Sequence, residues 1–146
     1  MHVLTKKSPV PVGIITMAEW PYWALDDPKA KKLAKKFMEK IDTNYASPHS
    51  YMGYLAVYAL KEAMEKVGEV NQEEIIKVLE GMEVPSTMGS MRVRACDHQI
   101  MWPVYAGKLG FIPGAGWPSV PDPIRPRDVE ATYGTCEQIY KIRKNQ

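Results

Sequence analysis

The sequence predicts a mixed α/β fold, because short strand-like runs alternate with segments of helical periodicity along one chain. An apolar, β-branched run, Val10 to Met17, is typical of a buried strand. Two longer segments, about 28–41 and 49–67, then repeat apolar residues at helical spacing. A later stretch, Thr87 to Leu109, returns to the two-residue period of strands.

Length and charge exclude several classes of protein. The 146 residues are enough for one domain with a stable core, and the net charge of +2 does not favour a nucleic-acid or membrane surface. No apolar run reaches the roughly 18 residues of a membrane-spanning helix. Pro9, Pro11 and Gly13 interrupt the apolar N-terminal stretch, so we expect no signal peptide here. If the protein works outside the cytoplasm, its export signal is missing from this chain.

The first helix is predicted from its start signal and its apolar stripe. Asp27 provides an acidic N-cap and Pro28 suits the first helical position. Six lysines fall mostly off the apolar stripe, which favours a solvated face over a polyanion-binding site. They are Lys29, Lys31, Lys32, Lys35, Lys36 and Lys40.

A second helix is expected from about His49 to Val67, where Gly68 supplies the stop. Its first half is apolar nearly all round, which predicts burial on most sides. A third helix follows Asn71, whose side chain can cap it, and ends near Gly81.

The stretch from Thr87 to Leu109 is predicted to form a hairpin. Met91 and Val93 alternate with arginines, as in a half-buried strand. Asp97 and His98 are turn residues, and a second apolar run extends from Ile100 to Ala106. Prolines then dominate, so residues 113–146 are predicted to be a proline-rich strap with a short terminal helix, Cys136 to Lys144. We therefore divide the chain in two, with residues 1–112 as an α/β segment and residues 113–146 as the strap.

No catalytic motif is present, and we predict neither an enzyme nor a cofactor. Cys96 and His98 could form a nucleophile pair or half of a zinc site, but residues two apart on a turn need not converge. The structural interpretation has Cys96 packed or bridged to Cys136, and free thiols remain an alternative. A bridge would close a loop of about forty residues and stabilise the fold by roughly 3–4 kcal/mol.

Three aromatic residues, Trp20, Tyr22 and Trp23, lie within four positions after the first strand. They can cap the core, which is the more common role of such residues. They can also line a ligand cleft, where rings provide contact area at a low cost in entropy.

An ordered series of short motifs resembles the C-terminal part of periplasmic solute-binding proteins of branched-chain amino acid (Leu/Ile/Val-binding) ABC transporters. The most characteristic pieces are T-M-G at Thr87–Gly89, R-A-C-D-H-Q at Arg94–Gln99 and P-V-Y-x-G-K at Pro103–Lys108. Gly53-Tyr54-Leu55-Ala56 matches the opening of the family's long helix, except that Leu55 replaces a frequent Asp. The resemblance continues from about Val12 to Leu109 but covers less than half of a family member.

The resemblance implies a partial, type I periplasmic-binding-protein-like three-layer fold, present as a C-terminal fragment. It implies that the chain contributes ligand-binding residues Trp20, Tyr22, His49 and Tyr51 to a cleft between two lobes. The ligand would be an amino acid or a similar small carboxylate or amide, the partner an ABC permease, and the location periplasmic or extracellular. The other ligand-holding groups of the family lie upstream, so no tight binding by this chain is expected.

Two further expectations remain open at this point. An incomplete sheet exposes edges and apolar faces, so the chain is expected to self-associate, as a homo-oligomer. The alternative function is a stand-alone α/β interaction module that uses the lysine-rich helix to contact an anionic partner.

Overall fold

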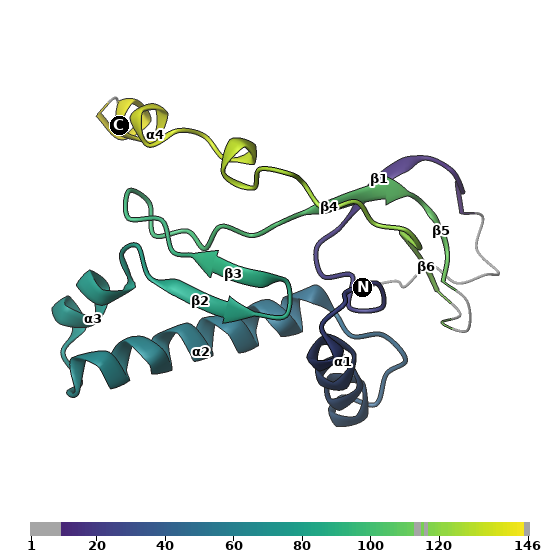
Figure 1. Cartoon of the computed structure of the whole chain (residues 1–146), viewed down its shortest axis with the longest axis horizontal. Helices are drawn as coiled ribbons and strands as arrows, with labels where there is room; N and C mark the ends of the chain where they lie inside the picture. The colour runs from purple at the N-terminus through teal and green to yellow at the C-terminus, as the bar shows by residue number, and fades with distance from the viewer. Residues whose placement is uncertain (1–9, 113–114, 116, 145–146) are drawn as a thin grey trace. The chain divides into compact units, whose positions relative to one another are not determined.

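The computed structural model describes residues 10–112, 115 and 117–144, and these form two compact units (Figure 1). Unit 1 combines the residues up to Tyr51 with Pro103–Arg127, and unit 2 combines Met52–Trp102 with the residues from Asp128 onward. The chain therefore passes between the units three times. The predicted division at residue 112 stays a prediction.

In unit 1 a small antiparallel sheet pairs β1 (Ile15–Ala18) with β4 (Tyr105–Lys108). Ala18 and Tyr105, which are register partners, are buried on one face. The predicted strand from Val10 to Met17 was too long, because Gly13 adopts a positive φ of 93° in a turn that delays the strand. It was also wrong about burial, since Ile15 and Met17 are exposed.

Helix α1 (Pro28–Lys40) begins as predicted, with the Asp27 side chain accepting a hydrogen bond from the Lys29 amide. Ala30 and Ala34 lie fully buried one helical turn apart. The six lysines are all exposed, as the interpretation of a solvated face predicts.

The proline-rich segment contains one regular element that was not expected. Strands β5 (Gly110–Phe111) and β6 (Pro118–Ser119) form a two-residue antiparallel pair, which adds a short edge pairing to the predicted extended strap. Short edge strands tolerate proline, which explains Pro118. Val120 is fully buried against Gly107 of β4, where a side chain on residue 107 would collide with it.

Helix α2 (Pro48–Val67) begins in unit 1 and continues in unit 2. Leu55, Ala59 and Ala63 form a buried stripe at four-residue spacing. The opposite side exposes Tyr54, Val57, Tyr58 and Leu60, so the prediction of burial on most sides was wrong. The hydropathy of those residues did not reveal which face has a packing partner.

Helix α3 (Gln72–Leu79) has the predicted cap, because the Asn71 side chain accepts from the Glu74 amide. Strands β2 (Glu83–Ser86) and β3 (Gly89–Arg92) then form a hairpin in which Val84 faces Met91. The predicted hairpin is confirmed only over a short stretch, where the Val93–Ile100 bridge is flanked by backbone hydrogen bonds from Arg94 to Gln99 and from Met101 to Arg92. Pro103 cannot donate to a ladder, so the second strand begins only at Tyr105 and pairs elsewhere.

The last segment carries a short 3₁₀ turn, η1 (Glu130–Thr132), and α4 (Cys136–Lys144), whose bounds match the prediction. Within the described ranges, no helix is both long and apolar enough to span a bilayer.

Candidate functional site

An inner aromatic cluster in unit 1 brings together three of the four predicted ligand-binding residues. Trp20 stacks on Tyr51 with ring centroids 4.3 Å apart and planes 10° from parallel, and it meets Tyr22 at 5.2 Å. These three side chains keep only 2%, 1% and 8% of their surface exposed for Trp20, Tyr51 and Tyr22. Segments thirty residues apart in the chain thus meet around one indole ring.

An outer group of rings extends the cluster. Trp117 packs edge-on against Trp23 at 5.2 Å and against Tyr45 at 4.8 Å. The indole nitrogens are satisfied by backbone carbonyls, since Trp23 Nε1 donates to Val120 and Trp117 Nε1 donates to Asn44. Sequence reasoning missed Tyr45 and Trp117. The signal for Trp117 was present in the sequence, because a large aromatic residue in a proline-rich segment is expected to pack against another part of the fold.

A tight backbone turn carries Trp20, Tyr22 and Trp23 and orients their rings differently. The Tyr22 amide donates to the Trp20 carbonyl and the Ala24 amide to the Pro21 carbonyl, both at 2.9 Å. Pro21 is buried at the centre of this turn, and its fixed φ limits the conformations open to its neighbours.

The hydroxyl groups of Tyr22 and Tyr45 remain protonated at neutral pH. Burial raises the pKa of Tyr22, although a hydrogen bond with the Ala46 backbone opposes the shift. Burial also raises the pKa of Tyr45, and the charges of Tyr22 and Glu19 add to the effect. The cluster therefore offers ring faces together with neutral phenols that can donate hydrogen bonds.

His49, the fourth predicted ligand-binding residue, is exposed in the first turn of α2. Its amide donates to Ser47 Oγ at 3.3 Å, and its Nδ1 lies 3.3 Å from the same oxygen. It precedes Tyr51 by two positions, close to the inner cluster in sequence. The ligand-binding role of Trp20, Tyr22, His49 and Tyr51 stays a prediction.

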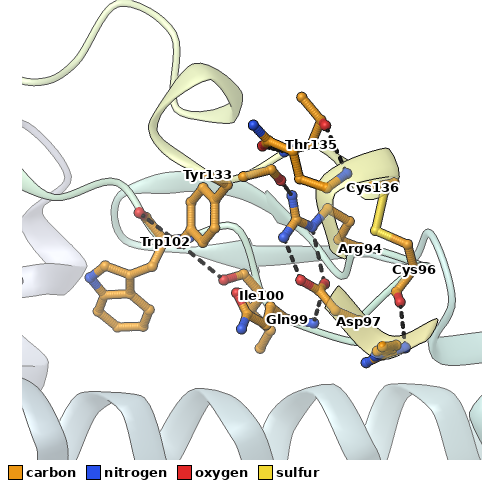
Figure 2. A network of polar contacts seen from close by, with 12 residues as sticks. Arg94, Cys96, Asp97, Gln99, Ile100, Trp102, Tyr133, Thr135 and Cys136 are labelled. Carbon is orange, nitrogen blue, oxygen red and sulfur yellow. Dashed lines mark hydrogen bonds and ion pairs between the residues drawn. A yellow bond between two sulfur atoms is a disulfide. The ribbon is translucent and has the colours of Figure 1, made fainter. Parts of the chain in front are cut away.

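A polar network in unit 2 centres on Arg94, which is 7% exposed (Figure 2). Its guanidinium binds both carboxylate oxygens of Asp97, and Nη1 donates to the Gly134 carbonyl. The same group lies 5.4 Å from the centroid of the Tyr133 ring. The hydrogen bond from Arg94 lowers the pKa of Asp97, so this carboxylate stays ionised.

Three further bonds hold the C-terminal segment, which we define as Asp128–Lys144. Tyr133 Oη accepts a hydrogen bond from the Trp102 amide at 2.6 Å (Figure 2). Cys96 and Cys136 form a disulfide with Cα atoms 5.8 Å apart. Arg143 Nη1 also donates to the Cys96 carbonyl at 2.9 Å. This arrangement anchors a segment of chain, and it presents no obvious reacting group.

Cys96 and His98 do not form the nucleophile pair or the half zinc site considered from the sequence. Cys96 has no free thiol because of its disulfide, and His98 Nε2 lies 2.9 Å from a carboxylate oxygen of Glu80. Among the described residues, no cluster of three His, Cys, Asp or Glu side chains could hold a metal ion.

Comparison with known proteins identifies the family. Residues 5–111 match the sequence model of a protein family that is described as periplasmic binding protein. No curated protein matches the chain.

Solved structures share the fold. An ABC-type branched-chain amino acid transporter protein from Rhodopseudomonas palustris CGA009 has 24% identity and a TM-score of 0.66, with 78% of this chain and 30% of that chain covered. A solute-binding protein from R. palustris BisB5, in complex with 3,4-dihydroxybenzoic acid, has 14% identity and a TM-score of 0.70, with 89% and 36% covered. The leucine-binding protein LivK from Thermotoga maritima MSB8 has 19% identity and a TM-score of 0.59, with 79% and 31% covered.

These neighbours confirm the predicted partial periplasmic-binding-protein-like fold, and the chain spans about a third of their length. The family model covers most of the chain, from the segment before β1 through β5. The chain belongs to the periplasmic binding protein family.

Proposed function

We propose that this chain is part of the substrate-binding component of an ABC transporter for branched-chain amino acids or similar small carboxylates or amides. The observation that carries the proposal is the family match over residues 5–111. The names of the solved neighbours support the ligand class, because they include a leucine-binding protein and a complex with a dihydroxybenzoic acid. In this role the protein binds its ligand without transforming it.

The aromatic cluster supplies the chemistry that such a ligand needs. Ring faces of Trp20, Tyr22 and Tyr51 suit an aliphatic or aromatic group. The neutral Tyr22 phenol and the exposed His49 ring can hydrogen-bond a carboxylate. We propose these four residues as this chain's share of the ligand contacts. The inner rings pack on one another here, so a ligand would bind at the margin of the cluster or after a small rearrangement.

In the complete receptor, ligand binding would shift a hinged protein toward a closed form that the membrane permease recognises. The place of action would be the periplasm or the extracellular side. The chain spans about a third of its solved neighbours, so its own affinity for ligand is expected to be weaker than micromolar.

Titration calorimetry of the whole chain tests this function. We expect weak binding of leucine, valine or 3,4-dihydroxybenzoate, and weaker binding still by His49→Ala and Tyr22→Phe. Tyr140→Phe is the matched control, because Tyr140 lies half exposed on α4. Absence of heat with every ligand at millimolar concentration would contradict the proposed site. Micromolar binding by the monomer would contradict the incomplete receptor.

A further inference from the structure

Helix α1 concentrates positive charge on one side, which we call the lysine face. A helix turns by about 100° per residue, so its lysines share the half of its surface that lies opposite the buried Ala30 and Ala34. Of the 19 basic and 17 acidic residues of the chain, α1 holds six and one, so the rest of the chain carries a net charge of −3. The small net charge of the whole chain therefore conceals an uneven distribution. The lysine face consists of Lys29, Lys31, Lys32, Lys35, Lys36 and Lys40.

This arrangement works against the stability of the helix itself. Lys31 and Lys35 repel each other at four-residue spacing, and two further pairs of lysines share that spacing. The first turn contains no acidic residue and places Lys29 near the positive end of the helix dipole. Among the described residues, Lys35 alone of the six lysines forms an ion pair, with Glu39 at 3.7 Å. A face that only contacts water does not need such an excess of one sign, because ordinary surfaces mix both signs.

The lysine face remains a surface in a larger receptor. The chain spans about a third of its solved neighbours, so the rest of the family fold would cover exposed apolar residues such as Ile15 and Met17. Lysine ammonium groups are strongly hydrated and are almost never buried without a partner. The lysine face is therefore expected to contact solvent in the complete protein as well.

The chemistry of this face selects the kind of partner. Bidentate recognition of a single phosphate or carboxylate favours arginine, and α1 contains none. The face also offers no ring on which nucleic acid bases could stack, since Phe37 of α1 packs on Trp20 at 5.9 Å. Clusters of roughly four to eight basic residues along an amphipathic helix are typical of contacts with anionic lipid.

We propose that the lysine face of α1 attracts the protein to a membrane surface that contains anionic lipid. This inference rests on the proposed function, because a receptor that serves a permease works beside a membrane. The apolar side of α1 is already used within unit 1, where Ala30 and Ala34 are fully buried, so no part of the helix enters the hydrocarbon. The attachment is electrostatic and extends over about 8 Å at physiological salt. It holds the protein loosely enough to diffuse along the surface.

Co-sedimentation of the whole chain with lipid vesicles tests this attachment. We expect binding at low salt to vesicles of roughly two parts phosphatidylcholine and one part phosphatidylglycerol, and none to phosphatidylcholine alone. Added salt should release the protein. A variant with four changes on the lysine face should bind about a hundredfold more weakly or less, because each basic residue near the surface contributes roughly fivefold. The changes are Lys31→Gln, Lys32→Gln, Lys35→Gln and Lys36→Gln.

The matched control removes the same charge from exposed positions of unit 2 and should bind as the wild type does. Its changes are Lys61→Gln, Lys66→Gln, Lys77→Gln and Lys141→Gln. Circular dichroism should show that both variants fold, since neither changes a buried residue.

Several outcomes would overturn the proposal. They are no binding by the wild-type chain at low salt, binding that salt does not weaken, and equal binding by the two variants. Tighter binding to polyglutamate or to an oligonucleotide than to the mixed vesicles would assign the lysine face to another class of partner and would also overturn it. The assay contains no transported ligand, so a failure here is distinct from a failure of the ligand titrations.

Discussion

The inner aromatic cluster and the C-terminal segment are held by different kinds of interaction. Trp20, Tyr22 and Tyr51 are almost completely buried against other rings. The segment Asp128–Lys144 contains no buried residue, and Tyr140 and Ile142 on α4 are more than half exposed. Its attachment depends on a disulfide, the Arg94 guanidinium and the Tyr133 hydroxyl.

The difference predicts different sensitivities. Burial responds to the volume and shape of side chains and little to solution chemistry. A segment held by a few specific bonds responds to reductant and to acid, and it can detach while the rest stays folded. The experiments below test this contrast, from the largest expected effect to the smallest.

Trp20→Ala should have the largest effect on stability. Truncation of a buried tryptophan loses packing on several rings at once, so the free energy of unfolding should fall by about 3–5 kcal/mol. Denaturant unfolding measures this loss. Tyr140→Ala, at an exposed aromatic position, should change the value by no more than about 0.5 kcal/mol. Equal losses in the two variants would remove the distinction between the regions.

Removal of the disulfide, by Cys96→Ser with Cys136→Ser, should release the C-terminal segment. The bridge spans 40 residues, and chain entropy assigns such a loop roughly 3–4 kcal/mol. Amide exchange in Asp128–Lys144 should accelerate strongly, while the cluster around Trp20 keeps its protection. Unchanged exchange in α4 would show that polar contacts suffice to hold the segment.

Tyr133→Phe should loosen the same segment by a smaller amount. It leaves the Trp102 amide without its acceptor, a cost of roughly 1–3 kcal/mol for a buried donor. Tyr140→Phe removes a hydroxyl from an exposed ring and serves as the control. Thermal unfolding distinguishes the two, and a Tyr133→Phe variant as stable as the control would refute the role of this hydroxyl.

Acid should weaken the attachment through Asp97. Its pKa in the folded chain lies below the ordinary 3.8, first because Arg94 hydrogen-bonds the carboxylate. The ionised pair therefore contributes fully above the ordinary value, and the contribution is lost as pH falls through the lowered pKa. Asp97→Asn should flatten this part of the pH profile of unfolding. If Asp97→Asn kept the wild-type pH profile of unfolding, the loss of stability in acid would come from another group.

Local features of the sequence predicted local structure well. Asp27 and Asn71 cap the helices that they were expected to cap, and α4 has its predicted bounds. These signals act over three or four residues, so the sequence alone contains them.

Features that depend on distant partners were predicted poorly. Met91 pairs with Val84 rather than with the later apolar run, and the apolar side of α2 is exposed. In the candidate site, Trp20 and Tyr22 were predicted because they lie close together in the sequence. Trp117 was missed because its partners Tyr45 and Trp23 lie more than seventy residues away. Strand register and ring stacking depend on tertiary contacts that no local pattern encodes.

Two-dimensional NMR of the whole chain, titrated with leucine and with 3,4-dihydroxybenzoate, tests the central claim most directly. The ligand contacts of this family member should lie in the aromatic cluster and not in the C-terminal segment. We predict that weak, saturable shifts map to Trp20, Tyr22, His49 and Tyr51 and leave Asp128–Lys144 unchanged. Shifts confined to the C-terminal segment, or no shifts with either ligand, would contradict the account.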